Sequence, residues 1–138
     1  MRAVFVDTSF WIALVSERED RHAETVALTG GPFVPGRLVT SNHVRGETWT
    51  FLRHRHGHRI ATAFLERVDR TRRLSVVFVS EQLERDALRW LRRHDEREYS
   101  FVDATSFALM RSLKIREALA FDGDFSAAGF VELRAEPA

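Results

Sequence analysis

The sequence predicts an α/β protein with three layers, α/β/α, around a central parallel sheet of four to five strands. Short apolar runs alternate along the chain with longer segments whose apolar residues recur every three or four positions. The runs are continuously apolar, which is typical of strands covered by helices on both faces. No linker or repeat divides the 138 residues, so we expect one domain over residues 1–138, with 135–138 as a frayed tail.

The first half of the chain predicts two strands and four helices. The expected elements are a strand at 2–6, helices at 10–15 and 22–28, a strand at 38–40, and helices at 42–55 and 59–72. Between the second helix and the second strand, the glycines and prolines of residues 30–36 mark a break on either side of Phe33 and Val34. Ser41 or Asn42 can cap the third helix, and Gly57 stops it.

The second half repeats the alternation. The expected elements are a strand at 74–79, a helix at 83–91, a helix at 100–113, and strands at 118–121 and 130–133. A polar run at 94–98 separates the two helices, and we assign its acids to the solvated surface.

Composition excludes several classes of protein. Twenty-one Lys and Arg stand against twenty Asp and Glu, so the net charge of +1 is not that of a strongly basic nucleic-acid binder. The absence of cysteine excludes disulfide scaffolds, thiolate metal sites and cysteine nucleophiles. The longest apolar runs are too short to cross a bilayer, and the N-terminus lacks the apolar stretch of a signal peptide, so we expect a cytoplasmic protein without a membrane partner.

Two aspartates follow directly on predicted strands. Asp7 comes after the run at 3–6, and Asp122 comes after the run at 118–121. Ligand sites of open parallel sheets lie outside the carboxyl ends of the strands, which makes both residues candidates for a site. Each also has a local explanation, because Asp7 can cap the next helix and Asp122 begins an Asp-Gly turn.

Two further acids occupy predicted inward helix faces. Glu47 is three residues after Val44 and four before Phe51, on the apolar stripe of its helix, unless it reaches solvent at the edge and pairs with an arginine. Asp103 shares a face with Phe107, yet Ser100 and Asp103 also have the spacing of a capping box. Four converging carboxylates would raise one another's pKa values, and a hard divalent cation such as Mg²⁺ removes that conflict.

Four motifs carry a family resemblance. They occur in this order: Val4-Phe5-Val6-Asp7-Thr8-Ser9, Ser41-Asn42-His43-Val44-Arg45-Gly46-Glu47, Tyr99-Ser100-Phe101-Val102-Asp103-Ala104-Thr105-Ser106 and Ala120-Phe121-Asp122-Gly123-Asp124-Phe125. This pattern resembles the PIN-domain nucleases, most closely the VapC-type toxins of bacterial toxin–antitoxin pairs, and it extends over residues 2–134.

The resemblance implies a function and a set of site residues. It implies a PIN-like fold, one or two Mg²⁺ or Mn²⁺ ions, endonucleolytic hydrolysis of tRNA or ribosomal RNA, a homodimer, and inhibition by a VapB-like antitoxin. The catalytic and metal-binding acids would be Asp7, Glu47, Asp103 and Asp122, with Asp124 as a less certain fifth ligand. Thr8, Ser9 and Ser106 would support them through hydroxyl groups.

Basic residues suggest where RNA binds. Arg53, Arg55 and Arg59 are candidates for phosphate contact, although solvated helix faces explain such residues equally well. The neighbouring His54, His56 and His58 lack the spacing that brings helical ligands onto one metal ion.

Two other functions fit parts of the pattern. The alternative to a nuclease is a non-catalytic RNA- or protein-binding PIN-like domain whose acids are structural. A receiver-like signalling module fits worse, because Lys114 precedes the fourth strand and no acid adjoins Asp7.

Overall fold

Five parallel strands form the middle layer of the molecule, in the spatial order β3-β2-β1-β4-β5. The computed structural model describes residues 2–30 and 36–135 of the chain. The strands are β1 (Ala3–Val6), β2 (Arg37–Ser41), β3 (Leu74–Val77), β4 (Glu117–Leu119) and β5 (Val131–Glu132). The strand order reverses direction beside β1, so the first strand lies at the centre, flanked by β2 and β4.

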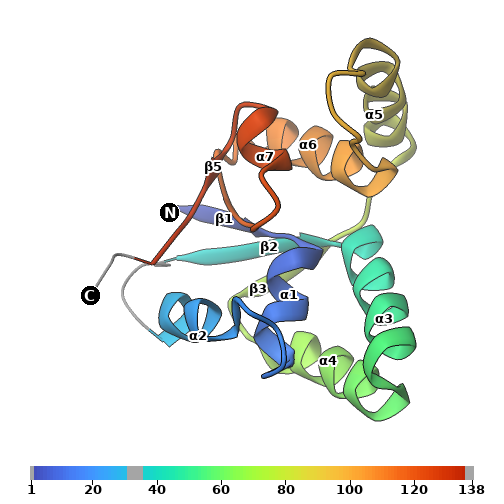
Figure 1. Ribbon diagram of the computed structural model, residues 1–138. Coiled ribbons are helices and arrows are strands. Elements are labelled where there is room, and N and C mark those ends of the chain that lie inside the picture. The colour runs from blue at the N-terminus through green and yellow to red at the C-terminus, as the bar shows by residue number, and fades with distance from the viewer. Residues whose placement is uncertain (1, 31–35, 136–138) are drawn as a thin grey trace.

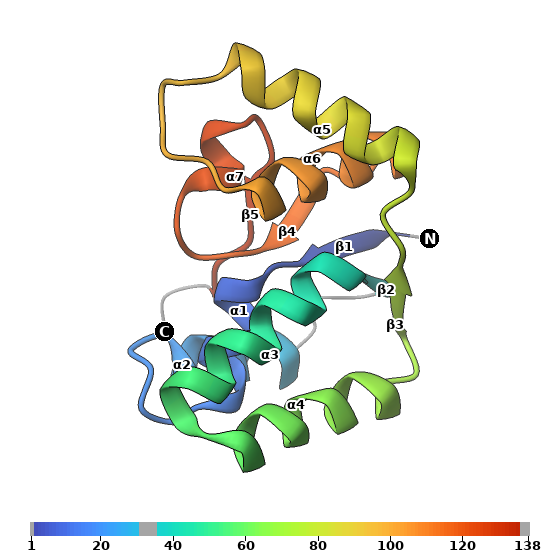
Figure 2. The same ribbon diagram turned by 90° about the vertical axis from the view of Figure 1, so that its right-hand side faces the viewer.

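Helices cover both faces of this sheet and give the predicted three layers. They are α1 (Thr8–Val15), α2 (His22–Gly30), α3 (Asn42–His56), α4 (His58–Arg70), α5 (Glu81–Arg93), α6 (Phe101–Leu113) and α7 (Asp124–Ala127). Helices α1 to α4 lie on one side of the sheet and α5 to α7 on the other (Figures 1 and 2). The α/β/α fold that the sequence predicts is therefore confirmed.

Each side of the sheet has its own aromatic packing. On the side of α6 and α7, Phe107 meets Phe125 edge to face at 4.9 Å, and Phe125 stacks on Phe5 of β1 at 6.0 Å. On the other side, Trp11 of α1 meets Phe64 of α4 edge to face at 5.5 Å. Because the central strand is buried on both faces, the side chains at its carboxyl end also leave water, which matters for the site described below.

Side-chain caps attach helices to the ends of strands and loops. Asp7 is the only residue between β1 and α1, and it caps that helix. The Ser41 hydroxyl accepts the Val44 N–H at 3.0 Å, so α3 begins directly at the end of β2. Ser100 caps α6. These caps place the N-termini of α1, α3 and α6 at the carboxyl edge of the sheet.

Several predicted boundaries differ from the structure. β4 ends at Leu119, two residues before the predicted end, so Ala120 and Phe121 separate the strand from Asp122. A short helix, α7, follows that the sequence analysis did not predict, because four residues show no helical period; Gly123 precedes it at φ +83°. β3 and β5 are also shorter than predicted.

The structure describes only part of the predicted break at residues 30–36 and of the predicted tail at 135–138. Residues 31–35 and 136–138 lie outside the described residues, and with them Phe33, Val34 and most of the predicted frayed tail. Ala135 is held, because its N–H donates to Glu24 Oε2 at 3.1 Å. Within the described ranges, no helix is long and apolar enough to span a membrane.

Candidate active site

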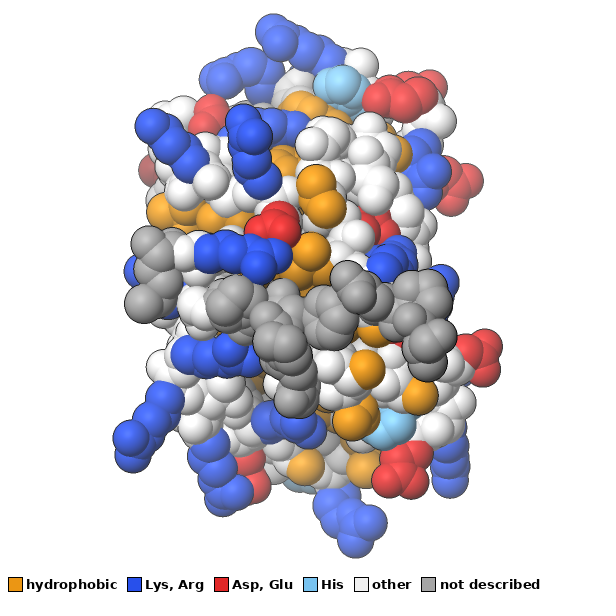
Figure 3. Space-filling view, turned by 90° about the vertical axis from the view of Figure 1, so that its left-hand side faces the viewer, with side chains coloured by type: hydrophobic (Ala, Val, Ile, Leu, Met, Phe, Trp, Pro, Cys, Tyr) orange, Lys and Arg blue, Asp and Glu red, His pale blue; other side chains and the backbone are white. Residues whose placement is uncertain are grey.

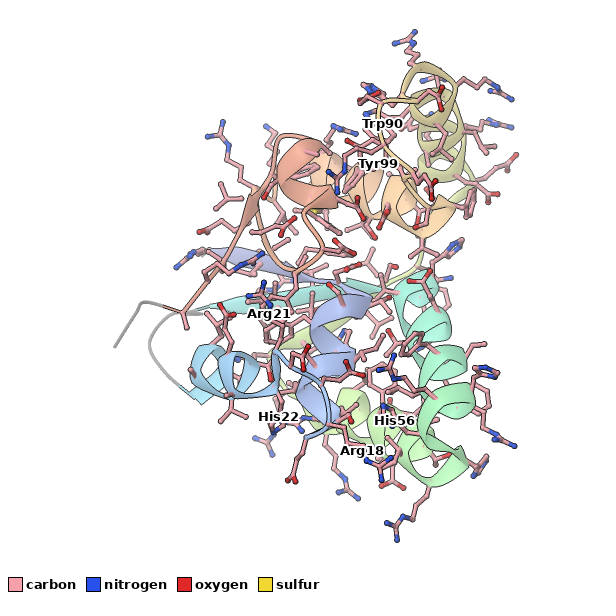
Figure 4. All side chains as sticks on the ribbon, viewed as in Figure 1. Arg18, Arg21, His22, His56, Trp90 and Tyr99 are labelled. Carbon is pink, nitrogen blue, oxygen red and sulfur yellow. The ribbon has the colours of Figure 1, made fainter. Side chains whose placement is uncertain are left out.

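An acidic pocket of about 400 Å³ opens at the carboxyl edge of the sheet. Its walls come from the start of α1, the middle of α3, the loop between α5 and α6, the start of α6, and the turn before α7. The lining residues are Asp7, Thr8, Ser9, Ile12, Glu47, Phe51, Glu98, Ser100, Asp103, Asp122 and Asp124. All five predicted acids thus line one pocket, although they are far apart in the sequence. In Figure 4, side-chain oxygens gather between α1 and α6.

Asp7 lies at the base of this pocket and is 3% exposed. Its Oδ2 accepts the Ser9 N–H at 3.2 Å and the Ser9 hydroxyl at 2.8 Å, and Ser9 Oγ accepts the Phe121 N–H at 3.0 Å. Burial raises the pKa of Asp7 to about 7; the Asp122 carboxylate also raises it, while the bonds from Ser9 lower it. Asp7 therefore caps α1 and also contributes a buried carboxyl group with a raised pKa to the pocket, so its sequence position fits both a helix cap and a site residue.

Asp103 is held by the capping box that its spacing predicted. The Asp103 N–H donates to Ser100 Oγ at 2.9 Å, and the Ser100 N–H donates to Asp103 Oδ2 at 3.0 Å. Burial raises the pKa of Asp103 to about 6, the bond from the Ser100 backbone lowers it, and Asp124 and Asp122 raise it further. The box uses one carboxylate oxygen and fixes the side chain at the pocket wall.

Asp122 lies in the turn between β4 and α7, and Asp124 is the first residue of α7. The Asp124 N–H donates to Asp122 Oδ1 at 3.4 Å. Burial raises the pKa of Asp122, and the charge of Asp124 raises it further. Asp124 itself is paired with Arg97, whose Nε donates to Asp124 Oδ1 at 3.0 Å. The turn and the start of α7 thus carry one carboxylate facing its acidic neighbours and one that already has a counter-charge.

The predicted inward orientation of Glu47 is wrong. In α3 the buried positions are Val44, Thr48 and Leu52, one face of the helix, whereas Glu47 and Phe51 are exposed. Both exposed residues still line the pocket, because this flank of α3 faces the start of α6. Helical spacing alone could not separate the buried face from its flank, since both contain apolar residues.

Glu98 is a pocket acid that the sequence analysis missed. It belongs to the polar run at 94–98, which was assigned to the solvated surface, and it is exposed. Only the path of the loop between α5 and α6 brings it to the pocket rim. No local sequence signal distinguishes it from Asp95 or Glu96, which do not line the pocket.

A family model described as the PIN domain matches residues 4–131. The chain belongs to the PIN-domain family. It is 54% identical over 133 residues to the 23S rRNA-specific endonuclease VapC20 of two Mycobacterium tuberculosis strains, covering 96% of this chain and 99% of the relative. It is 29% identical over 129 residues to a VapC ribonuclease of Archaeoglobus fulgidus, covering 90% of this chain and 80% of the relative.

A solved structure agrees with this assignment. The crystal structure of M. tuberculosis VapC20, described as a toxin that cleaves the sarcin–ricin loop, matches with a TM-score of 0.90 and 54% identity. The match covers 95% of this chain and 98% of that chain. The family and the VapC type that the motifs predicted are therefore confirmed, and the protein is a VapC-type PIN domain.

The hydroxyl residues of this PIN domain have different surroundings. Ser9 contacts Asp7 directly, and Thr8 lines the pocket and accepts a hydrogen bond from the Thr48 hydroxyl at 3.3 Å. Ser106 is completely buried and is not among the pocket-lining residues; its hydroxyl has no hydrogen-bond partner among the described residues. Ser9 is thus the hydroxyl that the structure connects most closely to the acids.

The predicted RNA-binding arginines do not line the acidic pocket of the PIN domain. Arg55 Nε is 3.3 Å from Glu19 Oε1, and its guanidinium lies over the Phe51 ring at 5.6 Å, so this side chain fastens the loop after α1 to α3. Arg59 lines a separate cleft of about 480 Å³. Arg53 is exposed on α3. RNA contact by these three residues stays a prediction, and Figure 3 shows basic side chains spread over one face without forming a single patch.

The histidine run has a packing role at one position. His56 Nε2 is 3.6 Å from Glu19 Oε1, and its side chain is 7% exposed. Figure 4 shows His56 and Arg18 beside the cleft between the loop after α1 and the end of α3. His58 meets the Trp49 ring edge to face at 6.3 Å. These contacts point the histidines at different neighbours, as the spacing predicted.

The pocket of the PIN domain fits a hard divalent cation by its chemistry. All its charged lining groups are carboxylates, and three of them have raised pKa values because burial and mutual repulsion disfavour their charges. Over residues 2–30 and 36–135, no three His, Asp or Glu side chains lie close enough together to hold a metal ion as they stand. Mg²⁺ retains several waters, which bridge to carboxylates that do not themselves reach the ion.

Proposed function

We propose that this protein is a Mg²⁺- or Mn²⁺-dependent endoribonuclease that cleaves ribosomal RNA and acts as the growth-inhibiting toxin of a VapBC-type pair. One observation carries the proposal: Asp7, Asp103 and Asp122 are brought together from three distant segments at the cost of raised pKa values. A merely structural set of acids would gain nothing from this arrangement, whereas a cation would offset the repulsion. The names of the relatives support the nuclease activity.

The side chains of the pocket have two roles: some would bind the cation, and others orient those ligands. Asp7, Asp103 and Asp122, with Glu47 at the exposed flank, would hold the cation. When bound, such a cation acts as a Lewis acid and lowers the pKa of a coordinated water. Ser9 fixes the rotamer of Asp7, and the Ser100 box fixes that of Asp103. Both acids are therefore oriented before substrate binds, which lowers the entropic cost of arranging the reacting groups.

Water is the attacking group that this pocket favours. The hydroxyl of Ser9 donates to Asp7 and accepts from the Phe121 N–H, so its proton and one lone pair are both engaged. No cysteine is present to act as a nucleophile. Ile12 and Phe51 add two apolar side chains to the lining beside the acids.

The substrate class comes from the relatives. VapC20, 54% identical to this chain, is named as specific for 23S rRNA, and its structure is described as that of a toxin cleaving the sarcin–ricin loop. We therefore propose 23S rRNA, within that loop, over tRNA as the target. The toxin would act in the cytoplasm, where ribosomes are, and a VapB-like antitoxin would restrain a homodimer.

The test is cleavage of intact ribosomes, deproteinised rRNA and tRNA by the purified protein, with RNA ends mapped by sequencing. We expect one cut in 23S rRNA with Mg²⁺ or Mn²⁺, and no cut with EDTA or with Asp7→Asn. Asp69→Asn, an exposed acid on α4, is the matched control and should cleave normally. Binding of RNA without cation-dependent cleavage would favour the non-catalytic alternative instead.

A further inference from the structure

Arg97 is a cation at the rim of an otherwise acidic pocket. It lies in the loop between α5 and α6, the same loop that supplies Glu98 and Ser100 to the pocket lining. Its Nε donates to Asp124 Oδ1 at 3.0 Å, and its Nη2 is 3.0 Å from the same oxygen. Nη2 also donates to the Asp122 carbonyl oxygen at 3.3 Å. One guanidinium therefore engages the turn and the start of α7, which carry two of the pocket acids.

The turn itself has a second support that does not involve Arg97. Glu132, with a side chain 3% exposed, accepts the Gly123 N–H at 3.3 Å and the Ser126 N–H at 3.0 Å. Arg134 in turn donates to Glu132 at 2.9 Å. Because these bonds hold the backbone on the far side, removal of the Arg97 side chain should release the Asp124 carboxylate and leave the turn in place.

The released carboxylate would be close enough to act in the pocket. Asp124 lines the same pocket as Asp103 and Asp122, two acids that would hold the cation, and its N–H donates to Asp122 Oδ1 at 3.4 Å. Its side chain is 17% exposed, and that of Arg97 is 42% exposed. Both contacts from Arg97 fall on Asp124 Oδ1, so the guanidinium offsets the charge of this carboxylate and ties it to the loop between α5 and α6.

We propose that Arg97 withholds Asp124 from the cation, so that Asp7, Glu47, Asp103 and Asp122 form the working ligand set. This inference rests on the proposed function, since it concerns the same cation. Arg97 is then a positioning residue that limits the negative charge available to the ion. Loss of a residue that supports the ligands would weaken cation binding, whereas loss of the Arg97 side chain should strengthen it.

Mn²⁺ alone is the probe, titrated into the full-length protein by calorimetry and by the electron paramagnetic resonance of free Mn²⁺. We expect Arg97→Gln to bind Mn²⁺ about 3- to 10-fold more tightly than the wild type, as one carboxylate is freed. Asp124→Asn should weaken Mn²⁺ binding much less than Asp122→Asn does, because it removes a nearby charge and not a ligand. Arg85→Gln, at an exposed arginine of α5 that pairs with Glu81, is the matched control and should change nothing.

The double variant separates a freed ligand from a general charge effect. If Arg97→Gln acts by freeing Asp124, its gain in Mn²⁺ affinity is larger when Asp124 is present than in the Asp124→Asn background, so the two changes are not additive. If it acts only by removing a positive charge, the same factor appears in both backgrounds, and the inference is wrong. A loss of Mn²⁺ binding by Asp124→Asn as large as that caused by Asp122→Asn would also overturn it, and this comparison does not depend on the folding of Arg97→Gln.

Asp7→Asn distinguishes this inference from the proposed function. Mn²⁺ binding that survives Asp7→Asn unchanged would place the cation outside the pocket and contradict the proposed site. Mn²⁺ binding that needs Asp7 but is indifferent to Arg97→Gln would leave the proposed site standing and reject only the role of Arg97.

Discussion

Replacing Asp7 by asparagine should stabilise the cation-free protein at neutral and alkaline pH. The pKa of Asp7 rises from an ordinary 3.8 to about 7 in the folded state, chiefly because the side chain is buried. The folded state therefore binds a proton more tightly than the unfolded chain, and the wild type loses stability as the pH rises from about 4 to about 7. Asparagine has no proton to lose, and its side-chain oxygen can still accept the bonds from Ser9.

The magnitude follows from the shift. About three pKa units at 1.36 kcal/mol each give a ceiling of about 4 kcal/mol above pH 7. Part of this destabilisation of the wild type is already present at pH 5, because the carboxyl group of Asp7 is ionised in the unfolded chain at that pH and protonated in the folded state. The free energy of unfolding of Asp7→Asn should therefore exceed that of the wild type by a margin that widens by about 2.5 kcal/mol between pH 5 and pH 8.

The assay is urea unfolding in EDTA, followed by tryptophan fluorescence at several pH values. Asp69→Asn serves as control, and its difference from the wild type should not change with pH. A constant margin for Asp7→Asn, or a variant less stable than the wild type at pH 8, would refute the burial argument. Adding Mn²⁺ should stabilise the wild type and not the variant, because the ion binds only the folded state that retains the carboxylate.

Three further predictions follow from the contacts around the pocket. Ser9→Ala should lower the free energy of unfolding by about 1 to 3 kcal/mol in urea unfolding, since the Phe121 N–H loses its acceptor. In steady-state cleavage, the same variant should lower kcat by a larger factor than it changes KM. Arg55→Gln should lower the free energy of unfolding by no more than about 1 kcal/mol, because its pair with Glu19 is partly exposed, and weaker rRNA binding in a filter-binding assay is expected if Arg55 makes the predicted phosphate contact. Phe51→Ala should weaken RNA binding by about 3- to 10-fold if the exposed ring stacks on a base, with Asp7→Asn as the background that prevents cleavage.

Local patterns succeeded where a short segment decides the outcome alone. The Ser100–Asp103 box, the start of α3 at Ser41 and its end at Gly57 all form as their residues predict, because a cap involves only neighbours in the chain. Asp7 was correctly placed for the same reason: β1 is a short apolar run, and the polar residue that ends it must lie at the edge of the sheet.

The same patterns failed where the rotation of a helix or the path of a loop matters. Glu47 was assigned to the buried stripe of α3, yet the helix buries a neighbouring face. Glu98 was assigned to solvent, yet its loop returns to the pocket. RNA contact by Arg55 stays a prediction; its pair with Glu19, 36 positions earlier in the chain, is a contact that local patterns do not predict.

The sequence by itself determined the layered fold, the family and five of the six acids that line the pocket, because apolar periods and short motifs are local properties of the chain. Only the tertiary structure decided how those acids differ from one another. Burial beneath the sheet edge raises the pKa of Asp7, whereas a bond across 27 residues gives Asp124 its own counter-charge. Solvation and long-range pairing depend on the whole packing, and they separate carboxylates that look alike in the sequence.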